Sequence, residues 1–187
     1  MNHLTGGLTD PAPQSAAAFR IIMQAMARPG TIHRLTGGTA PAPVGPAAAT
    51  ALLVLCDPTT PLHLAGAADH PSLRNWVSFH TGAPLTDAET AQFAHGRWDD
   101  LMPLDRFPVG LPDYPDRSAT LIVELDALDP TGTRLTGPGI QDAAHLSLPA
   151  PDVLAANAAR FPLGLDFIFT CGDRLACLPR STQLGDV

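Results

Sequence analysis

The stretch PDYPDRSATLIVEL, residues 112–125, changes character halfway along its length. Its second half, residues 118–125, is rich in apolar and β-branched residues and predicts a strand that enters a buried core. Its first half combines two prolines with charged and hydrogen-bonding side chains. Because this is the clearest strand of the chain, we ask whether the polar residues at its entrance seal the strand or hold a ligand.

Three residues at this entrance are candidates for a site: Tyr114, Asp116 and Arg117. Pro115 disfavours helix at Tyr114 and prepares the backbone for a turn. Asp116 is of the type that accepts backbone hydrogen bonds in turns, and Arg117 offers a planar fork of donors that suits a carboxylate or a phosphate. Two interpretations stay open: an Asp116–Arg117 network that closes the strand end, or an Arg117 that faces a ligand.

The chain before this strand begins with residues 1–13, which we interpret as a loose N-terminal leader. A helix is predicted next, with Ser15 as its cap and Pro29-Gly30 as its end. Its apolar residues recur at the spacing of one helix face, and they are Phe19, Ile22, Met23 and Met26.

The remaining sequence predicts both helices and strands. Helices are predicted at 46–55, 72–80 and 152–160, with Asp152 as the cap of the last, and strands at 31–36, 61–64 and 133–136. Residues 87–94 fit either type, residues 96–117 form a long irregular connection, and residues 165–182 predict an antiparallel hairpin. Mixed strands and helices on one core predict a single three-layer α/β domain with a mixed sheet over residues 14–187.

The charge balance limits the possible partners. Eleven basic and eighteen acidic residues give a net charge of −7, which argues against nucleic-acid binding and against a polybasic membrane surface. The apolar runs are much shorter than the roughly 20 residues of a membrane span. The N-terminal residues lack the basic and apolar pattern of a signal peptide, so we expect a cytoplasmic protein.

The residue types also restrict the chemistry. All eleven basic residues are arginines, so the chain has no lysine for a pyridoxal phosphate aldimine or for a phosphate-binding loop. Cys56, Cys171 and Cys177 do not have the spacing of a zinc or redox motif, and the histidines are scattered. We therefore assign no catalytic residue, no metal and no cofactor.

Two further corners are candidates for binding a ligand or a partner. Arg28 and His33 flank the Pro29-Gly30 corner, where Arg28 either stabilises the end of the helix or contacts an anion. Gly137 and Gly139 follow a predicted strand, and backbone N–H groups there could cradle an anion, although Gly-Pro-Gly is also an ordinary turn.

Five blocks of the sequence together resemble one family. They are FRIIMQAMARPGTIHRL (19–35), LRNWVSFHTGAP (73–84), YPDRSATLIVEL (114–125), TGPGI (136–140) and FPLGLDFIFTCGDRLACLPRST (161–182). In this order and spacing they resemble PhnH, a subunit of the bacterial carbon–phosphorus lyase system. The resemblance covers about residues 14–182.

The resemblance implies an accessory subunit of the lyase core complex rather than an enzyme that acts alone. PhnH proteins are homodimers that join PhnG, PhnI and PhnJ, and the early step couples a phosphonate to ATP, releasing adenine and forming a ribose 1-phosphonate 5-triphosphate. The fold implied is that of the large domain of pyridoxal-phosphate-dependent transferases, here without the cofactor. In this context Arg28, Arg117 or the Gly137–Gly139 loop would contact a phosphate-rich ligand, and residues 96–117 would be a partner surface.

Two alternatives remain. The chain is an independent anion-binding enzyme if His33, Asp116 and Arg117 converge on one pocket. It is a purely structural dimeric scaffold if its arginines are all paired with carboxylates of the same chain.

Overall fold

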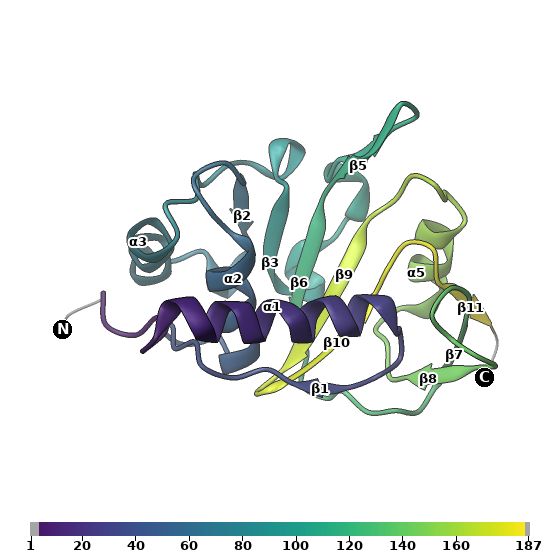
Figure 1. Ribbon diagram of the computed structural model, residues 1–187. Coiled ribbons are helices and arrows are strands. Elements are labelled where there is room, and N and C mark those ends of the chain that lie inside the picture. The colour runs from purple at the N-terminus through teal and green to yellow at the C-terminus, as the bar shows by residue number, and fades with distance from the viewer. Residues whose placement is uncertain (1–3, 186–187) are drawn as a thin grey trace.

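A six-stranded mixed sheet runs through the centre of the molecule in the computed structural model, which describes residues 4–185 (Figure 1). The strand order is β1-β10-β9-β6-β3-β2. The neighbours β9, β6, β3 and β2 are parallel, whereas at one edge β10 pairs antiparallel with β9 and β1 pairs antiparallel with β10. The strands are β1 (His33–Arg34), β2 (Leu62–Leu64), β3 (Phe93–Arg97), β6 (Thr120–Glu124), β9 (Asp166–Cys171) and β10 (Arg174–Leu178). The prediction of an α/β fold with a mixed sheet is confirmed.

Both faces of this sheet are buried, which explains why its central strands are so apolar. In β6, Ile122 points to one side, and Leu121 and Val123 point to the other. The same alternation in β9 places Ile168 on the first side and Phe167 and Phe169, whose rings stack 5.7 Å apart, on the second. The sheet therefore separates two hydrophobic clusters.

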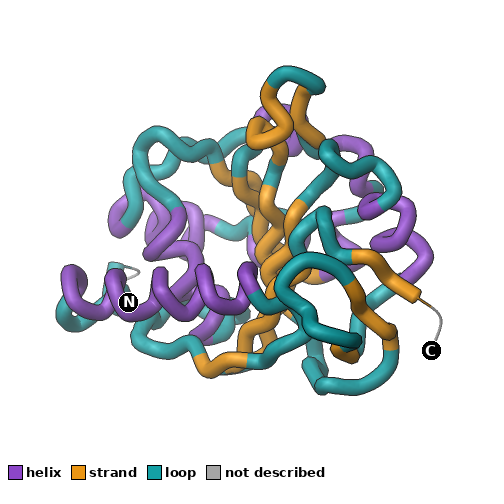
Figure 2. Tube along the Cα trace, turned by 45° about the vertical axis from the view of Figure 1, so that its right-hand side comes forward, coloured by secondary structure: helices purple, strands orange, loops and turns teal. Residues whose placement is uncertain are grey.

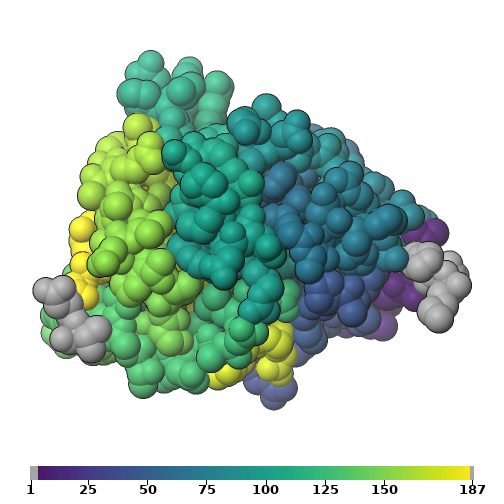
Figure 3. Space-filling view, turned by 180° about the vertical axis from the view of Figure 1, so that it is seen from behind, coloured from purple at the N-terminus to yellow at the C-terminus, as the bar shows by residue number. Residues whose placement is uncertain are grey.

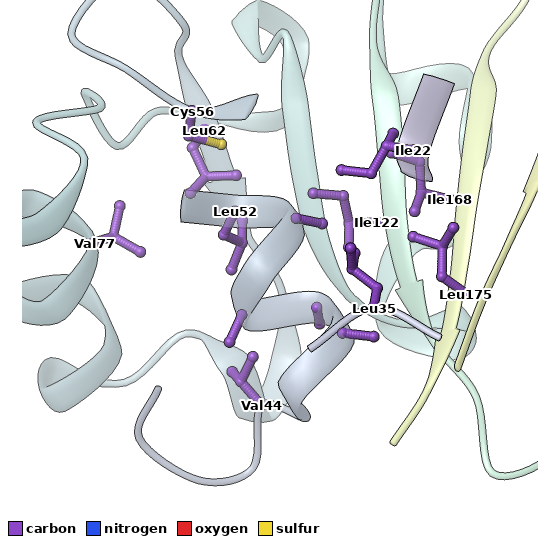
Figure 4. Close-up of a cluster of buried hydrophobic side chains, with 14 of the residues drawn as sticks. Ile22, Leu35, Val44, Leu52, Cys56, Leu62, Val77, Ile122, Ile168 and Leu175 are labelled. Atoms are coloured by element: carbon purple, nitrogen blue, oxygen red, sulfur yellow. The ribbon is translucent and has the colours of Figure 1, made fainter. Parts of the chain in front are cut away.

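Helices cover the first face. They are α1 (Pro11–Ala27), α2 (Pro46–Leu55) and α3 (Pro71–His80). Each has a proline in its first turn, where the missing N–H costs nothing and the fixed φ favours a helix. Figure 4 shows part of this cluster, in which Ile122, Ile168 and Leu175 extend from the sheet toward the helices.

The second face is covered by shorter elements. They are α4 (Trp98–Leu101), α5 (Pro151–Ala158), the 3-10 turns η2 (Ala88–Thr90) and η3 (Leu104–Arg106), and a small sheet of β11 (Gln183–Gly185), β7 (Thr133–Thr136) and β8 (Ala144–Leu146). A further 3-10 turn, η1 (Gly66–Ala68), follows β2, and its Ala68 packs in the cluster of the first face. Leu101, Leu135 and Leu154 are fully or almost fully buried against the sheet. Figure 3 shows the molecule from behind.

The first helix begins earlier than the sequence predicts. It starts at Pro11 rather than after Ser15, and Gly7, within the expected leader, exchanges two backbone hydrogen bonds with Thr39. Its apolar face is also only partly buried, because Ile22 is in the core whereas Phe19 and Met23 are 47% and 54% exposed.

The connection 96–117 is not irregular. It contains the end of β3, the helix α4 and an antiparallel hairpin of β4 (Val109–Leu111) and β5 (Tyr114–Ser118), which projects from the rest of the chain (Figures 1 and 2). The expected strand 118–125 is therefore two strands, because Ser118 belongs to the hairpin and β6 begins at Thr120.

Several other predictions can be compared with the structure. The helix 46–55 and the antiparallel pairing of β9 with β10 are confirmed. Asp152 is not a cap, because it lies in the first turn of α5, and Ala150 takes the capping position. No helix among residues 4–185 is long and apolar enough to cross a membrane.

Candidate functional site

A cavity of about 180 Å³ opens at the carboxyl ends of β3 and β6. Its polar lining comes from His95 and Arg97 of β3 and from Glu124 and Asp126 at the end of β6. Its apolar wall includes Pro43, Ala68 and Leu125. Ligands of open α/β sheets bind outside the carboxyl ends of the strands, so the cavity, called the His95 cavity below, has the expected position of a ligand site.

His95 is fixed by its backbone environment. The side chain is 1% exposed, and its Nδ1 lies 3.0 Å from the carbonyl oxygen of Ile122 on the neighbouring strand. A carbonyl only accepts, so Nδ1 carries the proton when the ring is neutral, and Nε2 carries the lone pair. Burial lowers the pKa of His95 from 6.5 to about 4, so the ring is neutral near pH 7.

Glu124 lies opposite this lone pair. Its Oε2 is 3.8 Å from His95 Nε2, and its Oε1 accepts a hydrogen bond of 2.8 Å from the backbone N–H of Gly45, the residue that caps α2. Burial raises the pKa of Glu124 above its usual value, although the Gly45 N–H and the charge of Arg97 oppose that change. The carboxyl group is therefore held in one orientation, with Oε2 left for other contacts.

Arg97 and Asp126 form an ion pair at the edge of the cavity, with Nη2 and Oδ2 2.5 Å apart. Both side chains are largely exposed, and the pair lowers the pKa of Asp126. The positive charge of Arg97 is thus largely neutralised by Asp126.

The cavity combines a neutral nitrogen acceptor with a carboxyl acceptor in a partly dehydrated setting. Such a pair accepts hydrogen bonds from a ligand and can take up a proton. Among the described residues, no three His, Cys, Asp or Glu side chains are grouped closely enough to hold a metal ion.

A second cavity, of about 330 Å³, lies beside β2 and α3 and includes His63, Asp69 and Arg74. Two of its charged groups are engaged with each other, because the guanidinium of Arg74 donates two hydrogen bonds to the carboxylate of Asp69. His63 Nδ1 lies 3.1 Å from the carbonyl oxygen of Thr86. The His95 cavity is the better candidate, because it lies at the carboxyl ends of two parallel strands and its histidine is 1% exposed, whereas His63 is only partly buried.

The residues predicted at the strand entrance lie on the β4–β5 hairpin, well away from this cavity. Tyr114 is 50% exposed, and the guanidinium of Arg117 stacks on its ring, 4.1 Å from the ring centre. The side chain of Asp116 is exposed and makes no hydrogen bond or ion pair within residues 4–185, so the Asp116–Arg117 network, the first of the two interpretations, is not found.

The other two predicted corners do meet each other. Gly139 packs so tightly against the end of α1 that a side chain there would collide with the carbonyl of Ala27 and press against the ring of Pro29. Arg28, in the same corner, is exposed, and no ion pair of it is found within residues 4–185. Gly137 has a φ of +125° and lies in a turn that is closed by a hydrogen bond from the Ile140 N–H to the carbonyl of Gly137.

His33 does not join the hairpin residues in a pocket. Its Nε2 lies 2.9 Å from the hydroxyl of Thr31, which in turn donates to the carbonyl of Arg28. Strand β1 and the β4–β5 hairpin lie at opposite ends of the molecule (Figure 1). The convergence of His33, Asp116 and Arg117, on which the independent-enzyme alternative depends, is therefore not found.

The sequence patterns did not predict that His95 and Glu124 lie side by side. Glu124 was visible as a charged residue at the end of a buried strand, which is where ligands of parallel sheets bind. His95 followed a segment that fitted either helix or strand, so its position at the same edge could not be deduced. The parallel register of β3 and β6 brings the two together.

Comparison with known proteins gives a consistent family. The family model described as "Bacterial phosphonate metabolism protein (PhnH)" matches residues 6–185. A protein of Rhizobium meliloti named as the PhnH subunit of alpha-D-ribose 1-methylphosphonate 5-triphosphate synthase is 40% identical over 96% of this chain and 94% of its own length. A putative C-P lyase subunit protein, HtxG, of Stutzerimonas stutzeri is 30% identical over 92% of this chain and 87% of its own.

Proposed function

This chain belongs to the PhnH family, and from that membership we propose that it is an accessory subunit of a carbon–phosphorus lyase complex. In this role it supports the coupling of a phosphonate to ATP that yields a ribose 1-phosphonate 5-triphosphate. The observation that carries the proposal is the 40% identity to the Rhizobium meliloti synthase subunit along nearly the whole of both chains.

The partners proposed are the PhnG, PhnI and PhnJ counterparts and a second copy of this chain, in the cytoplasm. Two exposed apolar surfaces support the proposal of partners. One is the tip of the β4–β5 hairpin, where Leu111 and Tyr114 are both at least half exposed. The other is a shallow surface on α1, where Phe19 and Met23 lie beside Met26. Apolar side chains gathered on a surface in this way are typical of protein contacts.

We also propose that the sheet shares the scaffold of the large domain of pyridoxal-phosphate-dependent transferases. Parallel strands flanked by helices, with antiparallel strands at one edge, support this proposal. The sequence contains no lysine, so this chain cannot hold the cofactor as an internal aldimine.

Co-purification tests the proposal. The tagged chain is expressed alone and with its PhnG, PhnI and PhnJ counterparts, and the mass and composition of each eluted species are determined. A dimer alone and a stable multi-subunit complex together are expected. A chain that elutes without any of these partners would remove the proposal.

A further inference from the structure

The His95 cavity presents acceptors to its ligand. His95 Nε2 carries a lone pair because Nδ1 donates to the carbonyl of Ile122. Glu124 Oε2 is a second acceptor, 3.8 Å away, while Oε1 is occupied by the Gly45 N–H. A ligand that binds both must therefore bring hydrogen-bond donors to two closely spaced points.

The same arrangement disfavours an anion. The N-terminus of α2 points into this region, but its Gly45 N–H binds the Glu124 carboxyl group and its Ala47 N–H donates to the carbonyl of Gly172. The carboxyl group of Glu124 thus stands where a phosphate would bind a helix N-terminus. The arginine at the edge, Arg97, is already paired with Asp126.

The size of the cavity narrows the ligand further. Pockets for drug-sized ligands hold roughly 300–1,000 Å³, whereas this cavity holds about 180 Å³. It therefore accommodates a single small ring and excludes a complete nucleotide. Pro43, Ala68 and Leu125 provide an apolar wall for the carbon face of such a ring.

We propose that the His95 cavity binds a pentose ring through two neighbouring hydroxyl groups, one donating to His95 Nε2 and the other to Glu124 Oε2. An acidic residue at the carboxyl end of a parallel strand binds ribose hydroxyls in dinucleotide-binding folds for the same physical reason. The phosphate-bearing part of the ligand then lies outside the cavity. The choice of ribose as the pentose rests on the proposed function, whereas the requirement for paired hydroxyls comes from the geometry.

The test uses the isolated full-length chain labelled with ¹⁵N, without partner subunits. Methyl β-D-ribofuranoside is titrated, and the Gly45 amide and the His95 ring nitrogens are followed by NMR. Both signals are expected to shift saturably with the riboside. The 2-deoxy analogue, which lacks one of the two hydroxyls, is expected to bind at least about tenfold more weakly.

Two variants sharpen the comparison. Glu124→Gln is expected to weaken riboside binding by about tenfold, because a neutral amide oxygen is a poorer acceptor than a carboxylate. Glu89→Gln, the same change at an exposed position of η2, is the matched control and should bind as the native chain does. If Glu124→Gln fails to fold, the comparison of the two ribosides on the native chain still decides.

The contradicting outcomes are equally definite. Equal binding of the 2-deoxy analogue, or no shift with either riboside, would overturn the proposal. Shifts of Gly45 and His95 with inorganic phosphate in place of the riboside would show an anion site and would overturn it too. Because no partner subunit is present, these results are independent of whether the chain assembles into the lyase complex.

Discussion

The Nε2 atom of His95 lies 3.8 Å from Oε2 of Glu124, at the carboxyl ends of two adjacent parallel strands. The two groups differ in how the fold holds them, since a strand carbonyl orients the imidazole and a helix-capping N–H orients the carboxyl group. Burial disfavours the charged form of both. The pair is thus kept as two acceptors facing one small cavity.

Stability should depend on the titration of His95. Its pKa is about 4 in the folded chain and 6.5 in the unfolded chain, so the unfolded state binds more protons between these values. Stability is therefore complete above pH 6.5 and is lost as the pH falls toward 4, by about 2 kcal/mol between pH 7 and pH 5. Urea unfolding of the native chain and of His95→Gln measures this difference.

The raised pKa of Glu124 contributes with the opposite sign, because its stabilisation is present at low pH and is lost as the pH rises. The comparison with His95→Gln removes that contribution, since both proteins retain Glu124. Parallel pH profiles of the two proteins would contradict the burial of a neutral His95.

The Arg180–Asp166 ion pair should contribute more than the Arg34–Asp173 pair, although both have an N···O distance of 2.5 Å. The side chains of the first are 14% and 20% exposed, and Arg180 also donates to the carbonyl of Pro115 in β5. Arg180→Ala should lower the free energy of unfolding by about 3 kcal/mol, because Asp166 loses its partner in a largely buried place.

The matched control is Arg34→Ala. The Arg34 side chain is 80% exposed, so its loss should change the free energy of unfolding by less than about 1 kcal/mol. Denaturant midpoints of the two variants measure the contrast. Equal losses would show that burial does not determine the contribution of these pairs.

Gly139→Ala should destabilise the chain more than Gly172→Ala. Both glycines have positive φ, +82° and +59°, so each substitution should lower the free energy of unfolding by about 1 kcal/mol, because alanine is strained in the left-handed region. A side chain at Gly139 also collides with the carbonyl of Ala27, whereas none of the described residues 4–185 lies within 4 Å of one at Gly172. In thermal unfolding, Gly139→Ala should have a clearly lower Tm than Gly172→Ala. The reverse order would contradict the close approach of the Gly139 loop to the end of α1.

The hairpin variants Tyr114→Ala and Arg117→Ala should leave stability within about 0.5 kcal/mol of the native value, because both residues are exposed. If the hairpin contacts a partner subunit, the same variants should reduce the recovery of the complex in co-purification. Asp113→Ala, at the tip of the same hairpin, is the control, because it removes a charge but no apolar side chain. Full recovery of the complex with Tyr114→Ala would remove the hairpin as a partner surface.

The parts of the fold that depend on local patterns were predictable. The hairpin of β9 and β10 was visible because two apolar runs flank Gly172-Asp173, and α2 because Pro46 opens an apolar run that ends at Leu55. The start of α1 was misplaced because Pro11 serves as its first residue, whereas Ser15 looked like the cap.

The site depended on long-range register and could not be predicted. The segments that carry His95 and Glu124 meet only because β3 pairs with β6 in parallel, which aligns Arg97 with Glu124. The hairpin before β6 was missed because prolines and charged residues disfavour buried strands, whereas this pair of strands is largely exposed.

The release of adenine tests the proposed subunit role most directly. The counterparts of the other synthase subunits are combined with ATP and methylphosphonate, with and without this chain, and adenine is measured over time. We predict that adenine forms only when the chain is present and that adding it back restores the rate. Equal release in its absence would contradict the role proposed for it.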